Sequence, residues 1–300
     1  MLLIVNPYAT TVSERLSGLV VHALQSRYKV SVVTTQARNH ATEIVRERAA
    51  DHDLVVAFGG DGTVNEIANG LAGTQVPMTA LPGGSTSVFA RMLGYSNDVI
   101  DATEQLLRVA DRFEPRSIDL GKVDDRYFTF TSGYGFDASV VAQIDSHPRM
   151  KARVGHWYGA YAGLKTAIGT YALNPPVIET TVDGERISDG VSAMIQNGEI
   201  YTFFNNKPLR VAVDAGLQSG SLAGAILKSS RPTVVPGIAR RVLSKRAEVV
   251  DHRSVESFSG ASEILLRADR DVPLHVDGDH IGSVREARYT IAPEALRVVS

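Results

Sequence analysis

Residues 58–66 read Phe58-Gly59-Gly60-Asp61-Gly62-Thr63-Val64-Asn65-Glu66, and this segment sets the architecture of the first part of the chain. It follows an apolar run at 54–57 and precedes a helical pattern, so a buried strand, a glycine turn and a helix start are expected in that order. Glycines let a backbone approach a ligand without side-chain clash. The N–H groups of the turn and of the first helical turn can then point at anionic oxygens. The segment therefore predicts a phosphate site at residues 59–63.

Asp61 adds a second element to this site. A bare carboxylate beside phosphates would repel them, and a bound Mg²⁺ removes that conflict. We therefore predict that Asp61 is a metal ligand for a magnesium–nucleotide complex. The alternative is a glycine-rich turn in which the Asp and Thr side chains only cap a helix.

The composition bounds the class of protein. Three hundred residues suit one large domain or two medium ones. The net charge of −2 gives no global basic field for nucleic acid. With no cysteine, disulfides, thiolate zinc sites and cysteine nucleophiles are excluded, which fits a cytoplasmic enzyme. No run approaches the roughly 18 apolar residues of a membrane span, so membrane contact is expected to be peripheral.

The first third alternates strand and helix patterns. Strands are predicted at 2–6, 30–35, 54–58 and 78–81, and helices at 41–50, 88–93 and 99–110, with another helix opened by a capping box at 11–14. This alternation predicts a parallel sheet with right-handed crossovers. Ligands of such sheets lie beyond the carboxyl ends of the strands. Asn6, Thr35 and the loops at 59–63 and 82–86 all lie at that edge and predict one nucleotide cleft.

After about residue 116 the pattern becomes β-rich, which predicts a sandwich-like second domain. Alternation over 126–131 indicates a strand, and Asp183-Gly184 between alternating runs indicates a hairpin. Further short strands are predicted at 190–196, 209–213, 221–227, 263–267 and 273–276. Helices are predicted near 136–146, 156–172 and 233–244.

An ordered set of motifs resembles the catalytic family of diacylglycerol kinases, which includes bacterial lipid kinases and sphingosine kinases. The Gly-Gly-Asp-Gly core alone is shared with NAD kinases and phosphofructokinases, but the set keeps the family's order from residue 6 to residue 279. Besides residues 59–66, it comprises Asn6-Pro7, Thr35 ahead of His40-Ala41, Leu81-Pro82-Gly83-Gly84-Ser85, Phe89-Ala90-Arg91, Ile118-Asp119-Leu120-Gly121, Gly133-Tyr134-Gly135-Phe136-Asp137 and His275-Val276-Asp277-Gly278.

The resemblance implies a division into a nucleotide-binding α/β domain at 1–118, completed by the returning chain end at 286–300, and a β-rich lipid-substrate domain at 119–285. It implies an ATP-dependent lipid kinase that uses Mg²⁺ and acts on a diacylglycerol-like or sphingoid lipid in phospholipid metabolism. Asp279 stands at the position of the family's catalytic glutamate, one methylene shorter, and is the predicted base. Its alternative is a plain Asp-Gly hairpin turn.

The remaining site candidates have weaker signals. Asp119 is predicted to support the base or the metal, with a strand-end turn as the alternative. Arg91 is predicted to steer phosphates, or else is an exposed helix arginine. The predicted nucleotide-binding residues together are Asn6, Thr35, Gly59, Gly60, Asp61, Gly62, Thr63, Asn65, Glu66, Ser85, Thr86 and Arg91.

Three departures from the family pattern keep other functions open. Ser87 stands where Asn is common, Asp279 is shortened, and Ser219-Gly220-Ser221-Leu222 lacks the aspartate of a structural metal site, so that metal is not predicted. The alternatives are an NAD kinase-like enzyme with a soluble substrate and a catalytically weak nucleotide-binding regulator.

Basic segments predict contact with an anionic membrane surface. Residues 228–246 hold six basic side chains interleaved with apolar ones. The alternative is a solvated helix packed on the β-rich domain. A second basic run at 147–156 is predicted to flank the lipid cleft, or else to be a helix start that faces water. Pairing of exposed β edges into a homodimer is left open.

Overall fold

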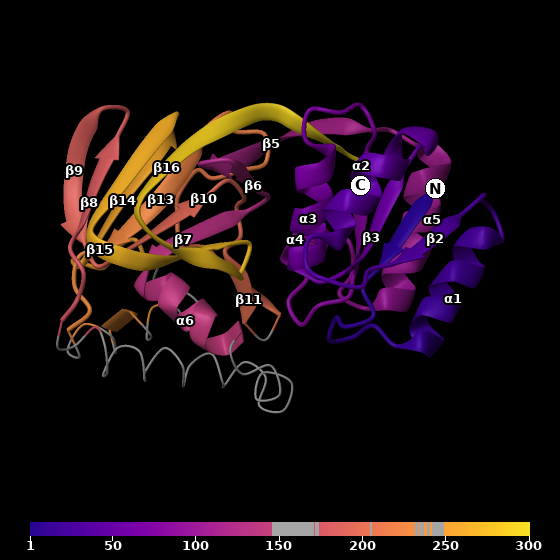
Figure 1. The fold of residues 1–300 in the computed structure, drawn as a ribbon, viewed down its shortest axis with the longest axis horizontal. Coiled ribbons are helices and arrows are strands. Elements are labelled where there is room, and N and C mark those ends of the chain that lie inside the picture. Colours follow the sequence, from indigo (N-terminus) through magenta and orange to yellow (C-terminus); the bar gives the residue numbers. More distant parts are fainter. Residues whose placement is uncertain are drawn as a thin grey trace. The chain divides into compact units, whose positions relative to one another are not determined.

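The chain divides into two compact units (Figure 1). The computed structural model describes residues 1–145, 171, 174–204, 206–231, 234, 237–238, 241 and 249–300. The first unit comprises Met1–Leu120 and Pro293–Ser300, and the second comprises Gly121–Ala292. The division lies close to the predicted boundaries at residues 118 and 286.

The first unit is built on a parallel sheet, as the alternating pattern predicted. Four neighbouring strands run in the order β2 (Ser31–Thr34), β1 (Leu2–Val5), β3 (Val55–Gly59) and β4 (Met78–Pro82). Every residue of β1, β3 and β4 is buried, which is why these strands read as continuous apolar runs.

Helices separate these strands along the chain. They are α1 (Glu14–Gln25), α2 (His40–Arg48) with the 3₁₀ turn η1 (Ala49–Asp51), α3 (Asp61–Leu71), α4 (Val88–Met92) and α5 (Val99–Arg112). Helix α1 begins later than the capping box at 11–14 predicted. Its cap is Ser13, whose hydroxyl oxygen accepts a hydrogen bond from the Leu16 N–H at 3.2 Å, so the Thr11 side chain is not the cap.

The end of the chain completes the first unit. The last strand, β16 (Asp279–Val298), pairs in parallel with β4 through Val298 and Met78. The Gly73 N–H donates to the Ala295 carbonyl at 2.8 Å, and the Val299 N–H donates to the Met78 carbonyl at 3.0 Å. The returning segment therefore covers an edge of the sheet that would otherwise be unpaired.

The second unit is β-rich, as predicted. Its elements are the end of β5 (Arg116–Val123), then β6 (Arg126–Phe128), β7 (Thr131–Gly135), α6 (Phe136–Asp145), β8 (Ile178–Val182), β9 (Glu185–Gly190), β10 (Ser192–Gln196), β11 (Thr202–Phe204), β12 (Lys207–Leu209), β13 (Leu222–Leu227), β14 (Val255–Ala261), β15 (Glu263–Val276) and most of β16.

Strand β15 organises this unit. Its first part pairs with β8 and its last part pairs with β7. Its pairing with β16 shifts register between Arg267 and Val272. The strands β7, β10, β13 and β14 then follow as antiparallel neighbours. The core between these strands contains Phe128 and Tyr289, whose rings meet edge to face with centroids 6.2 Å apart.

Four predicted strands need correction. The strands predicted at 263–267 and 273–276 are one strand, β15, because the register shift interrupts its pairing without ending it. The strand predicted at 126–131 is broken after Phe128, since the next backbone N–H groups donate to a buried carboxylate. The strand predicted at 209–213 ends at its first residue, and the Ala212 N–H donates to the Gln196 side chain.

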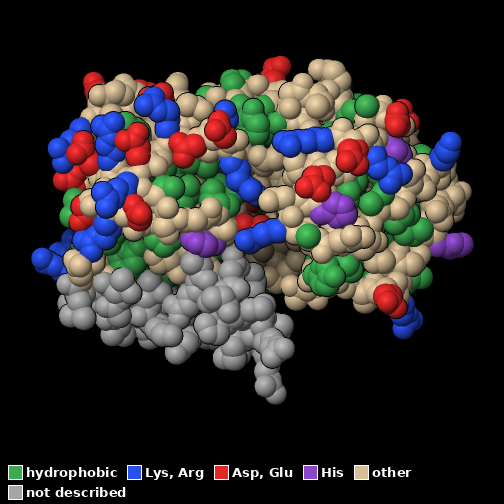
Figure 2. Space-filling view, in the orientation of Figure 1, with side chains coloured by type: hydrophobic (Ala, Val, Ile, Leu, Met, Phe, Trp, Pro, Cys, Tyr) green, Lys and Arg blue, Asp and Glu red, His purple; other side chains and the backbone are tan. Residues whose placement is uncertain are grey.

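The hairpin predicted at Asp183-Gly184 is confirmed, with both residues at positive φ between β8 and β9. Among the described residues no helix is long and apolar enough to cross a membrane. On the face seen in Figure 2, acidic and basic side chains are intermixed. Most residues of the helices predicted at 156–172 and 233–244, most of the basic segment at 228–246 and all of the basic run at 147–156 lie outside the described residues.

Candidate active site

Two glycine loops meet at the carboxyl ends of β3 and β4. The Gly83 N–H donates to the Gly59 carbonyl at 2.9 Å. A Cβ atom placed on Gly83 would lie only 2.7 Å from the Gly59 Cα atom, and one on Gly84 would lie 3.0 Å from the Gly60 Cα atom. The loops are therefore in backbone-to-backbone contact, a packing that only glycine allows at residue 83.

The first loop leads into α3 without a side-chain cap. Gly60 is the N-cap residue and has no side chain that could cap the first N–H groups of α3. The helix has eleven residues, so its N-terminus carries a positive partial charge together with outward N–H donors. These are the properties that a phosphate group requires. The predicted cradle of Gly59, Gly60 and Gly62 is thus formed by backbone atoms.

Asn6 and Thr63 form one structural pair in this loop. The Asn6 amide donates to the Thr63 hydroxyl at 2.9 Å, and the Thr63 side chain is buried. A Cβ atom on Gly59 would meet that hydroxyl at 2.6 Å. This pair ties the end of β1 to the start of α3 and explains why residue 59 is glycine.

Asp61 lies at the start of α3, and its carboxylate reaches the second loop. One oxygen accepts from the Val88 N–H at 3.1 Å and from the Thr86 hydroxyl at 3.4 Å, and the other accepts from the Phe89 N–H at 3.1 Å. Since Ser87 lies at positive φ and its side chain does not cap α4, Asp61 does so from another helix.

These partners bear on the predicted magnesium site. Mg²⁺ takes oxygen ligands in an octahedral shell, whereas the groups around Asp61 are hydrogen-bond donors. The described residues contain no cluster of three or more side chains of metal-binding type. Asp61 therefore has a structural role in holding the second loop, and its role as a metal ligand stays a prediction.

The side chains of Asn65 and Glu66 both bond to other parts of the protein. The Glu66 carboxylate accepts from the Asn39 N–H at 2.8 Å and from the Ala41 N–H at 3.1 Å. It therefore caps α2, whose own N-cap residue makes no side-chain cap. Asn65 is fully buried, and its side-chain oxygen accepts from the Asn69 amide at 3.2 Å. Their predicted nucleotide contacts remain predictions beside these structural roles.

The other predicted nucleotide residues differ in exposure. Ser85 is exposed on the second loop, and Thr35 is buried with its N–H bonded to the Val5 carbonyl at 2.9 Å. Arg91 is partly buried on α4, and this burial lowers the pKa of its guanidinium. A partly desolvated cation beside the glycine loops suits an anionic ligand better than a fully solvated one.

Asp119 occupies a structural position in the first unit. Its side chain is buried and accepts from the Glu294 N–H at 2.9 Å. Glu294 has a positive φ of 52°, so Asp119 stabilises an unusual backbone conformation in β16 after Pro293. The predicted catalytic role of Asp119 stays a prediction.

In the second unit, Asp279 is the first residue of β16 and follows a two-residue turn. Asp277 and Gly278 have φ values of 49° and 82°, which are typical of a tight hairpin. The Val276–Asp279 pair closes the hairpin between β15 and β16. The hairpin turn that was predicted as the alternative is thus present. Asp279 is half-buried, and its role as the base stays a prediction.

Sequence reasoning missed a polar network between β15 and α6. The Asp137 carboxylate lies 2.7 Å from His275 Nε2 and accepts from the Tyr201 hydroxyl at 2.6 Å. Burial alone would raise the pKa of Asp137, but the charge of His275 and hydrogen bonds from His275 and Tyr201 outweigh it and lower that pKa. The sequence signals were the motifs at 133–137 and 275–278, which contain Asp137 and His275, and Gly133 leaves space for the His275 ring.

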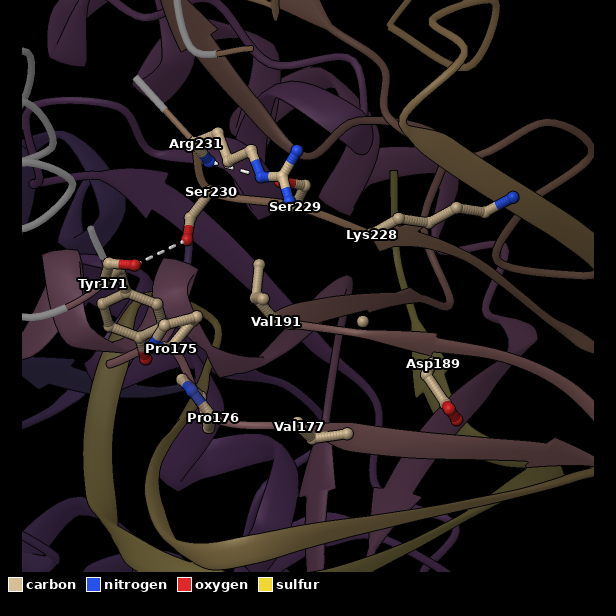
Figure 3. A pocket seen from close by; sticks show the side chains of 11 residues that line it. Tyr171, Pro175, Pro176, Val177, Asp189, Val191, Lys228, Ser229, Ser230 and Arg231 are labelled. Atoms are coloured by element: carbon tan, nitrogen blue, oxygen red, sulfur yellow. Dashed lines mark hydrogen bonds between the residues drawn. The ribbon is translucent and has the colours of Figure 1, made fainter. Parts of the chain in front are cut away.

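A pocket of about 330 Å³ lies elsewhere in the second unit (Figure 3). One side carries Arg231 and Ser229, and the opposite side carries Pro176 and Val177. Val177 lines the pocket and is 55% exposed. The pocket therefore combines an apolar wall with a cationic rim.

The fold and the site together define a two-domain protein whose first domain has the architecture of a nucleotide-binding α/β unit. Residues 1–123 match the family model of the diacylglycerol kinase catalytic domain, which confirms the resemblance predicted from the motifs.

Similar proteins extend this match beyond the first unit. A diacylglycerol kinase of Bacillus subtilis (strain 168) is 26% identical over 268 residues, covering 86% of this chain and 82% of that protein. One from Staphylococcus carnosus (strain TM300) is 25% identical, covering 90% and 84%. A crystal structure of a diacylglycerol kinase from Bacillus anthracis (strain Sterne) superimposes with a TM-score of 0.76 at 22% identity, covering 99% of this chain and 96% of that one, and shows that the fold is shared.

Proposed function

We propose that this protein is an ATP-dependent lipid kinase that transfers the γ-phosphoryl group to a hydroxyl of a diacylglycerol-like or sphingoid lipid. The observation that carries the proposal is the contact between the two glycine loops at the carboxyl ends of β3 and β4, in a domain that matches the diacylglycerol kinase catalytic model. Relatives named diacylglycerol kinase cover most of the chain and support the lipid as acceptor.

In this proposal, backbone groups hold the phosphates. The N–H groups at the start of α3 face the phosphate oxygens, and Arg91 on α4 adds a positive charge. Asp61 keeps the second loop beside the first by bonding the N–H groups of Val88 and Phe89. Mg²⁺ stays a predicted companion of ATP, and no step is assigned to it.

Asp279 accepts the proton of the acceptor hydroxyl as its oxygen attacks the γ-phosphorus. The bond between the γ-phosphorus and the bridging oxygen then breaks, and ADP leaves with that oxygen. Because aspartate is one methylene shorter than glutamate, its reach is about 1.5 Å less. The turn that carries Asp279 must therefore be held more accurately than in a chain with glutamate.

Peripheral contact with the cytoplasmic membrane surface is part of the same proposal. Lys228 and Arg231 begin the basic segment and line the pocket of Figure 3, which the exposed Val177 also lines. Lys228 is also paired with Glu256 at 2.5 Å, and Asp189 lines the same pocket, so the attraction is modest. An apolar wall with a cationic rim suits an anionic phospholipid surface.

The reaction is tested by measuring ATP consumption with Mg²⁺ in mixed micelles containing diacylglycerol, monoacylglycerol or sphingosine, and with NAD in separate samples. Turnover on one lipid, lost in Asp279→Asn, is the expected result. Turnover on NAD alone would support the soluble-substrate kinase instead. ATP binding without turnover on any acceptor would support the regulator.

Membrane contact is tested separately with vesicles of phosphatidylglycerol and of phosphatidylcholine. Neutralising both basic side chains, in Lys228→Gln with Arg231→Gln, should weaken binding to the anionic vesicles by at most about 30-fold, at roughly 1 kcal/mol per charge. Arg267→Gln with Arg285→Gln is the matched control, since both side chains are exposed, lie outside the pocket and pair with carboxylates that do not line it. Equal loss in both variants would contradict a site at the pocket.

A further inference from the structure

The tip of the β15–β16 hairpin is fixed by a carboxylate next to the proposed base. Asp277 is 4% exposed, and both of its side-chain oxygens accept hydrogen bonds. One oxygen accepts from the Thr129 N–H at 2.7 Å and from the Thr129 hydroxyl at 2.9 Å. The other accepts from the N–H groups of Phe130 at 3.0 Å and Thr131 at 3.1 Å. A buried carboxylate with four donors is fully compensated and rigid.

The segment that receives Asp277 is itself held in place. The Asn197 amide donates to the Thr129 carbonyl at 2.8 Å, and the Asn197 N–H donates to the Phe130 carbonyl at 3.0 Å. The Asp277 N–H donates in return to the Thr131 carbonyl at 2.8 Å. Residues 129–131 therefore provide a fixed anchor, which is also why they leave the strand pattern that the sequence predicted.

A two-residue turn connects the anchored Asp277 to Asp279. Asp277 and Gly278 form the turn, and Asp279 pairs directly with Val276 across the hairpin. A displacement of Asp277 would move Asp279 by a similar distance, because no flexible residue other than Gly278 separates them. The short aspartate side chain cannot compensate for such a shift by extending.

We propose that Asp277 is a positioning residue that holds Asp279 at the place where it can accept the proton of the acceptor hydroxyl. This inference rests on the proposed function. It adds that the hydrogen bonds of Asp277 matter more in this chain because the base is an aspartate. Misplacement by about 1 Å can cost on the order of 100-fold in rate.

The test compares Asp277→Asn in two backgrounds, with Asp279 and with Asp279→Glu. Asparagine keeps the shape but turns an NH₂ group toward N–H donors, so the anchor loosens without a cavity. The matched control is Asp183→Asn. Asp183 also precedes glycine in a hairpin turn of the same unit and also accepts from backbone N–H groups, those of Ser262 and Glu263, but it is remote in the chain from the proposed base.

With Asp279 present, Asp277→Asn should lower kcat about 10- to 100-fold while the KM for ATP changes by less than about twofold. With Asp279→Glu the loss should be several-fold smaller, because the longer side chain can reach the hydroxyl from a displaced turn. Asp183→Asn should leave kcat within about twofold. Rates are divided by the folded fraction measured by circular dichroism.

Equal losses in both backgrounds would overturn the positioning role, since general destabilisation does not depend on the length of the base. Hydrogen exchange of the peptide covering residues 276–282 provides a readout without turnover, and the proposal requires faster exchange in Asp277→Asn and not in Asp183→Asn. Unchanged exchange would also overturn it. A parent protein that phosphorylates no acceptor would instead overturn the proposed function, and the exchange result would still decide whether Asp277 holds the hairpin.

Discussion

Replacing Gly83 with alanine tests the contact between the glycine loops. The added Cβ atom would lie 2.7–2.8 Å from the Cα, C and carbonyl O atoms of Gly59. Ordinary contacts between carbon atoms are about 3.5–4.0 Å, so one loop must retreat by nearly 1 Å. These neighbours are backbone atoms of the last residue of β3, so they cannot rotate away as a side chain could. We expect Gly83→Ala to lower the free energy of unfolding by about 1–3 kcal/mol.

Nucleotide binding should respond more strongly than stability. Retreat of the loop also breaks the bond from the Gly83 N–H to the Gly59 carbonyl and misaligns the donors at the start of α3. Urea unfolding followed by circular dichroism, with and without ATP, measures both effects. The stabilisation that ATP gives to the parent protein should be small or absent in Gly83→Ala.

Gly18→Ala is the control for this experiment. Gly18 lies within α1, and a Cβ atom there meets nothing within 4 Å. Alanine favours helix by about 0.5–1 kcal/mol over glycine, so this variant should be as stable as the parent or more stable. If Gly83→Ala were as stable as Gly18→Ala and kept its response to ATP, the steric argument would be refuted.

Three further substitutions test individual side chains. Asp61→Asn should destabilise the first unit by about 1–2 kcal/mol in urea unfolding through loss of the cap on α4, and unchanged stability would contradict that role. Glu66→Ala should cost about 1 kcal/mol through loss of the cap on α2, and faster hydrogen exchange confined to the start of α2 is the diagnostic observation. Asp137→Asn should be destabilising at pH 7. Since the pKa of Asp137 is lowered in the folded protein, its stabilisation is present above the unfolded pKa near 4 and is lost as pH falls through the folded value, so the difference in Tm from the parent should shrink below about pH 4. A difference that does not change with pH would exclude the ionised carboxylate as its cause.

Local sequence patterns predicted most of the fold. The buried strands of the first unit are continuous apolar runs, and the Asp183-Gly184 turn has the residues that positive φ requires. The register shift in β15 was not predictable, because residues 268–271 resemble a loop in composition and only their neighbours show that the strand continues.

The site was predicted less completely, since its side chains have partners far away in sequence. Asp61 was expected to bind a metal because its sequence neighbours are glycines. Its hydrogen-bond partners Val88 and Phe89 are 27 and 28 residues later in the chain, on α4. The Asp137–His275 pair joins residues 138 positions apart. No local pattern specifies contacts of this kind, so they emerge only when the strands are paired.

The return of β16 to β4 has a consequence for synthesis of the chain. The first 120 residues leave the ribosome before the last strand of the first unit has been made. Until then β4 lacks its pairing with Val298, and the Tyr95 hydroxyl lacks the Val299 carbonyl as its acceptor. At usual translation rates the delay is on the order of ten seconds or more, during which the second unit emerges in full. The edge of β4 thus stays unpaired until Val298 has been made, and the first unit is completed after the second although most of its residues are made first.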